Sequence, residues 1–337
     1  MKLEQVAKRA GVSTATVSRV LNNQQLVKGK TRIKVLKAIE ELRYHPNLHA
    51  RTLAGGKSKT IGVIVSNMEN PFFFDIYHAV ETDAHALGYE VVVANTDYRS
   101  EQLVTSIRLM IGRRVAGLAA IVSEMDPALI EELTSSSIPV VFYDVGAPRR
   151  NITNIRVNYR RGVEKVMQYL HGMGHRKLGF VGHHALLGPI NERMKTVLDI
   201  VAQYGSGVEV RTASDSDTLE GGRQATRALL ATGYRPTAIV CVNDVMAVGS
   251  LRELRERGLR VPQDVSVTGF DNIKLSEFCD PPLTTVHIPR DRIGHIICQR
   301  LIPQEAAPAV DRDIAIDPEF VVRESTGPAT VKIAAKR

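Results

Sequence analysis

The segment at residues 11–23, GVSTATVSRVLNN, combines small hydroxyl side chains with one arginine and two asparagines. Such side chains hydrogen-bond to phosphates and to base edges, and an arginine can hold O6 and N7 of a guanine with two bonds. Val17 and Leu21 lie one helical turn apart and are predicted to face a supporting helix. The outward side chains are then those of Thr14, Ala15, Ser18 and Arg19.

Two further helices are predicted to position this segment. One covers residues 3–10, ends at Gly11 and is followed by Ser13, whose hydroxyl can cap the next helix. Another covers roughly residues 31–43, and its predicted inner face carries Val35, Leu36, Ile39 and Leu42. A helix, a glycine turn and a capped second helix are typical of the helix-turn-helix, whose second helix enters the major groove. A three-helix structural bundle without a ligand is the alternative.

The positive charge of the chain is concentrated in the same region. The net charge is +8, and residues 1–60 hold 13 of the 44 Lys and Arg but only 3 of the 36 Asp and Glu. A basic module attached to a near-neutral body predicts a polyanionic partner. The alternative is a solvated basic face that binds nothing.

From Thr60 onward, short apolar runs alternate with helical patterns of ten to fifteen residues. This alternation predicts an α/β fold with buried parallel strands. The number of strands favours two doubly wound lobes with a break near residues 155–160. The predicted strands are at residues 60–65, 90–95, 117–122, 139–144, 177–182, 238–244 and 265–271.

Motifs of the common enzyme classes are missing. The chain has no nucleophile elbow, P-loop, zincin motif or glycine-rich dinucleotide loop after the first strand. We therefore expect neither an enzyme nor a bound cofactor or metal. No run of eighteen apolar residues is present, the N-terminus is charged, and three widely spaced cysteines favour reduced thiols. These features predict a cytoplasmic protein that does not span a membrane.

Several long motifs then resemble the lac-repressor (LacI/GalR) family of bacterial transcription regulators. The resemblance extends from residue 3 to about residue 326. The motifs that carry it are VAKRAGVSTATVSRVLNN, YHPNLHARTLAGGKSKTIGVIV, NPFF, NTDYRSEQ, GHRKLGFVG, TAIVCVND, GLRVPQDVSVTGFDN and PPLTTV.

The resemblance implies an N-terminal three-helix headpiece and a core like periplasmic binding proteins, with two doubly wound parallel-sheet lobes. It also implies a hinge helix between headpiece and core. The implied parts are a headpiece at 1–46, hinge and linker at 47–59, one lobe at 60–157 and 288–318, the other at 158–287 and 319–327, and a disordered tail at 328–337.

The family pattern also implies the residues of two sites. At the DNA they are Thr14, Ala15, Thr16, Ser18, Arg19, Asn22, Lys28, Thr31, Tyr44, Asn47, His49, Ala50 and Leu53. Leu53 aligns with the leucine that such proteins wedge into the minor groove, where unstacking bends the duplex. The effector site, beyond the carboxyl ends of the strands, would use Asn70, Phe72, Phe73, Asp144, Arg193, Asn243 and Asp271.

The implied function is a repressor that binds a pseudo-palindromic operator as a homodimer. Its implied effector is a sugar, a sugar phosphate or, with less support, a purine; the sequence leaves open whether it induces or co-represses. Three alternatives remain: a sugar receptor, a sugar-modifying enzyme, and a DNA-binding protein controlled by a protein partner. The first leaves the basic N-terminus unexplained, and the second lacks a catalytic motif.

Overall fold

The computed structural model separates the chain into two compact units, Met1–Ser58 and Lys59–Arg337. It describes residues 3–21, 27–44, 58–123, 129–131, 133, 138–144, 151–184, 188–302 and 312–330.

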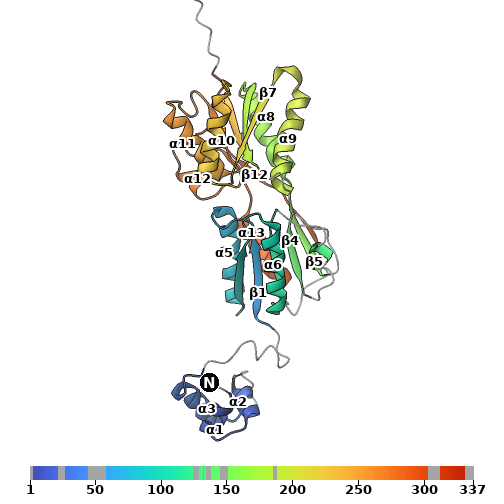
Figure 1. Ribbon diagram of the computed structural model, residues 1–337, viewed down its shortest axis with the longest axis vertical. Coiled ribbons are helices and arrows are strands. Elements are labelled where there is room, and N and C mark those ends of the chain that lie inside the picture. The colour runs from blue at the N-terminus through green and yellow to red at the C-terminus, as the bar shows by residue number, and fades with distance from the viewer. Residues whose placement is uncertain are drawn as a thin grey trace, which may run out of the picture. The chain divides into compact units, whose positions relative to one another are not determined.

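The first unit is a small helical headpiece with α1 (Leu3–Ala10), α2 (Thr14–Leu21) and α3 (Gly29–Glu41) (Figure 1). The turn after α1 places Gly11 at φ +67°, a left-handed conformation that favours glycine. The Ser13 hydroxyl accepts a hydrogen bond from the Thr16 N–H at 3.2 Å, so the predicted cap of α2 is confirmed. The headpiece core contains Val6, Ala7, Val17, Val20, Val35 and Ala38.

One side chain of the headpiece departs from its predicted position. Leu36 is 50% exposed, so its assignment to the inner face of α3 is wrong. Val35 lies on the inner face as predicted, and Ala38, three residues further on, takes the place expected for Leu36 on the side that meets α1 and α2.

The first lobe of the core contains a six-stranded parallel sheet in the order β11-β5-β4-β3-β1-β2. Helices α5 (Pro71–Ala86) and α13 (Arg290–Leu301) pack on one face, and α6 (Ser100–Gly112) packs on the other. The strands are β1 (Thr60–Val65), β2 (Glu90–Asn95), β3 (Leu118–Ile121), β4 (Val140–Tyr143), β5 (Ile152–Val157) and β11 (Asp313–Ile316).

The second lobe contains a four-stranded parallel sheet in the order β7-β6-β8-β9. A separate antiparallel pair joins β10 (Thr285–His287) to β12 (Glu319–Val321). The remaining strands are β6 (Lys177–His183), β7 (Glu209–Asp215), β8 (Ala238–Cys241) and β9 (Ser266–Thr268). The helices are α8 (Tyr159–Gly172), α9 (Gly188–Tyr204), α10 (Leu219–Ala231), α11 (Asp244–Glu256) and α12 (Leu275–Phe278), with a 3-10 turn at Gly205–Gly207.

Helices lie on both sides of this second sheet, α8 and α9 on one and α10 and α11 on the other (Figure 1). The chain passes between the lobes after β5, after β10 and after β11. Both lobes are therefore built from segments distant in sequence, and the predicted two-lobe α/β class is confirmed. In the described parts of the chain, none of the helices combines the length and apolar character that a membrane span requires.

Glycines allow α10 and α11 to approach closely. A Cβ at Gly222 would lie 2.2 Å from the Met246 carbonyl oxygen, closer than real Cβ contacts. We expect Gly222→Ala to lower the free energy of unfolding by about 1–3 kcal/mol, because the two backbones must separate. Gly112→Ala is the control, since its Cβ would meet nothing within 4 Å. Denaturant unfolding of both variants tests this, and equal stabilities would contradict it.

Candidate functional site

The outer face of α2 carries the side chains that the sequence predicts at DNA. Val17 and Val20 are buried and fix the rotation of the helix. Thr14, Ala15 and Arg19 are exposed, and Thr16 and Ser18 are half-buried at the edge of the same face. The exposed face of α2 can therefore present hydroxyl and methyl groups from its first turn and the Arg19 guanidinium from its last turn to a groove.

The start of α3 is the second basic feature of the headpiece. Lys28 occupies the N-cap position, is exposed and makes no capping hydrogen bond with its side chain. Lys30 and Lys34 are also exposed. Unpaired N–H groups at a helix start together with lysines favour a phosphate.

Of the other residues predicted at DNA, two are half-buried in the headpiece and five lie outside the described residues. Thr31 is half-buried in the first turn of α3, and Tyr44 is half-buried against the headpiece core. Asn22, Asn47, His49, Ala50 and Leu53 lie outside the described residues, and their roles stay predictions.

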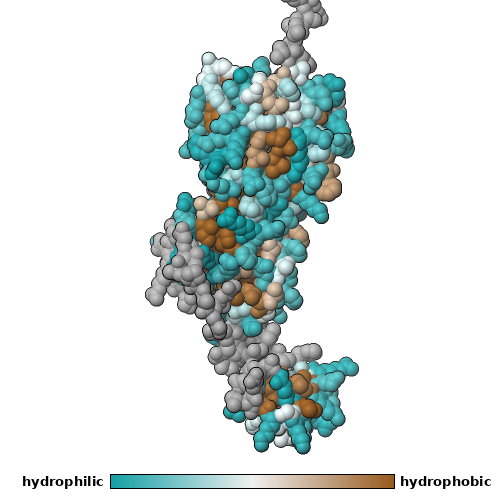
Figure 2. Space-filling view, turned by 180° about the vertical axis from the view of Figure 1, so that it is seen from behind, coloured by the Kyte–Doolittle hydropathy of each residue, from teal (hydrophilic) through white to brown (hydrophobic). Residues whose placement is uncertain are grey.

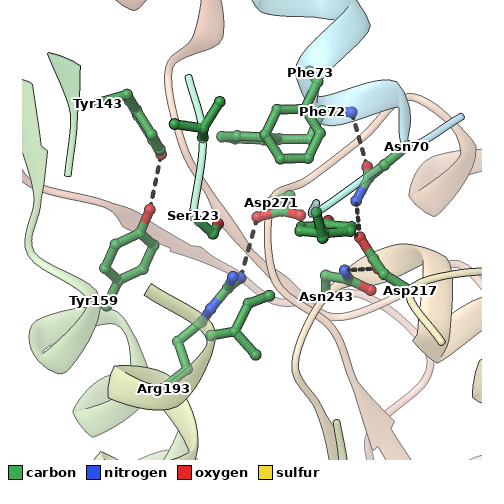
Figure 3. A pocket seen from close by; sticks show the side chains of 13 residues that line it. Asn70, Phe72, Phe73, Ser123, Tyr143, Tyr159, Arg193, Asp217, Asn243 and Asp271 are labelled. Atoms are coloured by element: carbon green, nitrogen blue, oxygen red, sulfur yellow. Dashed lines mark hydrogen bonds and ion pairs between the residues drawn. The ribbon is translucent and has the colours of Figure 1, made fainter. Parts of the chain in front are cut away.

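A cavity lies between the lobes of the core, beyond the carboxyl ends of strands from both sheets (Figure 3). It has a volume of about 30 Å³, enough for about two water molecules. The described residues that line it are Asn70, Phe72, Phe73, Tyr98, Val122, Ser123, Tyr143, Tyr159, Ile190, Arg193, Asp217, Asn243 and Asp271.

Two asparagines in this lining hold helix starts in place. The Asn70 Oδ1 accepts from the Phe72 N–H at 3.0 Å and caps α5, while the Asn243 Oδ1 accepts from the Met246 N–H at 2.9 Å and caps α11. Each amide nitrogen is thereby turned toward the carboxylate of Asp217 (Figure 3). Capping fixes both side chains, so their remaining polar atoms are preorganised for binding.

Arg193 brings a positive charge into the cavity from α9. Its guanidinium lies 3.5 Å from the Asp271 carboxylate and donates to the Val242 carbonyl at 2.8 Å. It also lies 5.1 Å from the ring centres of Tyr159 and Phe270. This stacking orients the planar group, which can then hold oxygen atoms of a ligand.

Asp271 lies opposite this arginine at the end of the second-lobe sheet. Its backbone has φ 109°, in the left-handed region, and its N–H donates to the Val286 carbonyl at 2.8 Å. Burial raises the pKa of Asp271 well above its usual value, although the Arg193 charge opposes the shift. The carboxyl group is thus held by the fold in a site where a polar ligand can replace lost water.

Asp144 is the one predicted effector residue outside the described lining. Its carboxylate accepts from the Tyr159 hydroxyl at 2.7 Å and from the Val157 N–H at 2.7 Å. Burial raises the pKa of Asp144 to about 7 against the effect of these two hydrogen bonds. Tyr159 in turn lies 2.9 Å, oxygen to oxygen, from the Tyr143 hydroxyl, which faces the cavity. Asp144 therefore orients two phenols that line the site.

Sequence reasoning missed five polar lining residues, Tyr98, Ser123, Tyr143, Tyr159 and Asp217. Tyr98 lies inside the NTDYRSEQ motif, and Tyr143 directly precedes Asp144, so both had a neighbouring signal. Asp217 follows a polar edge strand and has no such signal. Within the described residues, no group of three His, Cys, Asp or Glu side chains is placed to hold a metal ion.

Asp244 is buried directly behind the cavity. It accepts from the Ile273 N–H at 2.8 Å and from the Thr285 hydroxyl at 2.5 Å, which ties α11 to the loop bearing Asp271. Burial raises the pKa of Asp244 to about 7, with the hydrogen bonds from Thr285 and Ile273 opposing.

This raised pKa predicts a pH-dependent contribution to stability. The folded state holds a proton that the unfolded chain releases near pH 4, so the contribution is complete below pH 4 and is lost between about pH 4 and 7. The free energy of unfolding should therefore fall between about pH 4 and 7, and we expect Asp244→Asn to remove roughly 2–4 kcal/mol of that fall. Urea unfolding of both proteins across that range measures it, and parallel stability curves would contradict it.

Comparison with known proteins identifies both parts of the chain. Residues 2–47 match the family "Bacterial regulatory proteins, lacI family", and residues 167–326 match the "Periplasmic binding protein-like domain". The chain is 34% identical over 326 residues to the HTH-type transcriptional repressor PurR of Photobacterium profundum, covering 96% of this chain and 98% of the relative. It is 35% identical over 328 residues to PurR of Mannheimia succiniciproducens, again covering 96% and 98%.

A solved structure gives the same result. The fold is similar to a crystal structure of the lac repressor dimer bound to operator and the anti-inducer ONPF, with a TM-score of 0.83 and 30% identity. That likeness covers 97% of this chain and 99% of the other. Because the identity to the PurR relatives exceeds 30% over nearly the whole length, the chain belongs to the lacI family of bacterial regulatory proteins, which are DNA-binding transcriptional regulators and not enzymes.

Proposed function

We propose that this regulator is a homodimeric repressor that binds a pseudo-palindromic operator. A small molecule, a sugar or sugar derivative, binds the cavity between the lobes and controls DNA affinity. The headpiece at residues 1–46 reads the half-sites, and residues 47–59 connect it to the core.

The outer face of α2 is the observation that carries the DNA-binding proposal. Its buried valines leave Thr14, Ala15 and Arg19 exposed in the first two turns. The exposed lysines at the start of α3 supply phosphate contacts beside it. Base contacts from one helix and phosphate contacts from the next match the way a helix-turn-helix docks.

Replacing Arg19 by alanine tests this arrangement. We expect the preference for one base pair in each half-site to fall by about 1–3 kcal/mol, because a bidentate contact to guanine is lost. Arg9→Ala is the control, since Arg9 pairs with Glu41 at 2.6 Å within the headpiece. Sequence selection from a random DNA library, followed by binding to single-base variants, measures both. Equal loss on every sequence would make Arg19 a phosphate contact.

An apolar groove on the second lobe supports the dimer. It has a volume of about 370 Å³ and includes Leu219 and Leu275, which are 48% and 41% exposed. Phe278, next to the groove in sequence, is 71% exposed. Large apolar side chains exposed together favour a protein contact. Figure 2 shows apolar patches on a mostly hydrophilic face. A two-fold contact between copies would cover this face on both.

The cavity supports a small polar ligand. The rings of Phe72 and Phe73 meet edge to face with centres 5.4 Å apart and provide an apolar wall. Arg193, Asn243 and Asp271 provide donors and acceptors on the other sides. A sugar has apolar ring faces and hydroxyl edges, which suits such a site. A purine is the second candidate, because its flat ring can also pack on the phenylalanines.

Control of DNA affinity by the ligand follows from the position of the cavity, because residues of both lobes line it. A ligand that contacts both lobes binds one lobe arrangement better than another, and only that difference can change DNA affinity. A thermal-shift screen of sugars, sugar phosphates and purines on the full chain tests the ligand class, since a ligand that binds only the folded state raises the melting temperature.

A further inference from the structure

Asp217 lies at the centre of the hydrogen-bond network in the cavity (Figure 3). Its Oδ2 accepts from the Tyr98 hydroxyl at 2.6 Å and from the Asn70 amide at 3.2 Å. Its Oδ1 accepts from the Asn243 amide at 2.5 Å. The residue is only 4% exposed, so these donors replace nearly all of its water.

The donors to Asp217 come from both lobes. Tyr98 and Asn70 follow strands of the first lobe, whereas Asn243 follows β8 of the second. The Asn67 amide, also from the first lobe, donates to the Asp217 carbonyl at 3.3 Å. Asp217 therefore joins the two lobes across the cavity.

A ligand of sugar size must disturb this network. The cavity of about 30 Å³ is far smaller than a monosaccharide, so the lobes must move apart and part of the network must open. A buried carboxylate that loses donors is costly unless new donors replace them. The entering molecule must therefore bring hydroxyl or amino groups to the position of Tyr98 and Asn70.

The charge of the cavity sets a second condition. Among the described residues that line it, Asp217 and Asp271 are acidic and Arg193 is the basic one. Arg193 already lies beside Asp271 and bonds to the Val242 carbonyl. A phosphate or carboxylate placed against Asp217 meets a like charge in a poorly hydrated site, where repulsion is strong.

We propose that Asp217 determines specificity in this site and selects a neutral, hydroxyl-rich ligand over its phosphorylated or carboxylated counterpart. This inference rests on the proposed function, in which the cavity is the effector site.

The test uses the full-length protein and matched pairs of compounds. The pairs are ribose with ribose 5-phosphate, glucose with glucose 6-phosphate, galactose with galacturonate, and cellobiose with cellobionate, and hypoxanthine is added as a purine. Thermal shift finds the compounds that bind, and calorimetry gives their affinities. We expect a neutral sugar to bind at least 30-fold more tightly than its anionic partner.

Asp217→Asn keeps the shape of the side chain and removes its charge. We expect this variant to narrow the ratio of the two affinities at least tenfold, mainly by improving binding of the anionic partner. Asp215→Asn is the matched control, because that carboxylate accepts from the Ser216 N–H at 2.7 Å and is not among the lining residues. Its ratio should equal that of the native protein.

Several outcomes would overturn the inference. They are equal or tighter binding of the anionic partner to the native protein, binding of hypoxanthine alone, no binding of any neutral sugar, and an unchanged ratio in Asp217→Asn. The native ratio is decisive even if the variant folds poorly. Failure of the proposed function is separate: a sugar would then bind without changing operator affinity, or bind equally well after Arg193→Ala.

Discussion

Replacing Arg193 by alanine is expected to weaken effector binding about 1,000-fold and to abolish the effect of the ligand on operator binding. The guanidinium lies 3.5 Å from Asp271 and is stacked near two aromatic rings, so its direction is fixed before a ligand arrives. Five N–H donors allow it to serve Asp271, Val242 and a ligand oxygen together. A hydrogen bond from a charged donor contributes about 1.5–3 kcal/mol, and a ligand oxygen that stays buried without its donor costs about 1–3 kcal/mol more. Each 1.4 kcal/mol is a factor of ten in affinity.

The loss of folding stability in this variant is expected to be smaller. Burial already raises the pKa of Asp271, so its carboxyl can take up a proton once the guanidinium is gone. Arg160→Ala is the matched control, because Arg160 is exposed and pairs with Asp199 at 3.0 Å on the outer surface. Calorimetry with the sugar found by the screen and operator titration measure both effects. An unchanged ligand affinity in Arg193→Ala would mean that the cavity is not the effector site.

The central strands could be predicted from sequence because burial makes them continuously apolar. β1 and β3 are buried along almost their whole length, and their segments read as unbroken runs. β5 was missed because Thr153 and Asn154 are buried polar residues that interrupt such a run. β7 and β11 lie at sheet edges, where one side is solvated and alternation with polar residues hides the strand.

The same physics explains which cavity residues could be predicted. Six of the seven expected effector residues appear in the lining, because residues after parallel strands meet at one edge of a sheet. Asp217 could not be found in this way, since its local sequence is a polar loop and its partners in the first lobe are 119 and 147 residues distant. Asp144 was expected to face the ligand, but its carboxylate accepts a hydrogen bond from the Tyr159 hydroxyl instead. Its backbone is in the left-handed region, at φ 59°.

The second large effect is expected in the dependence of operator affinity on salt. Residues 1–60 hold 13 Lys and Arg against 3 Asp and Glu, and the proposed dimer would bring two such headpieces to the operator. Six to ten phosphate contacts release enough counterions to lower affinity by about 10³ to 10⁵ between 50 and 200 mM salt. Operator titrations at several salt concentrations measure this slope, and a flat response would contradict DNA binding by the headpiece.

The slope of operator affinity against salt concentration, both on logarithmic scales, also separates phosphate contacts from base contacts. Lys28 is exposed at the start of α3 and makes no capping bond, so Lys28→Ala should lower the slope by about one for each headpiece and leave base preference unchanged. Arg19→Ala should change base preference at one position instead. Lys8→Ala is the matched control, because that exposed lysine lies in the last turn of α1, outside the two helix starts proposed to meet DNA. If Lys28→Ala and Lys8→Ala lower the slope equally, the headpiece attracts DNA through its general charge and the start of α3 is not a specific phosphate site.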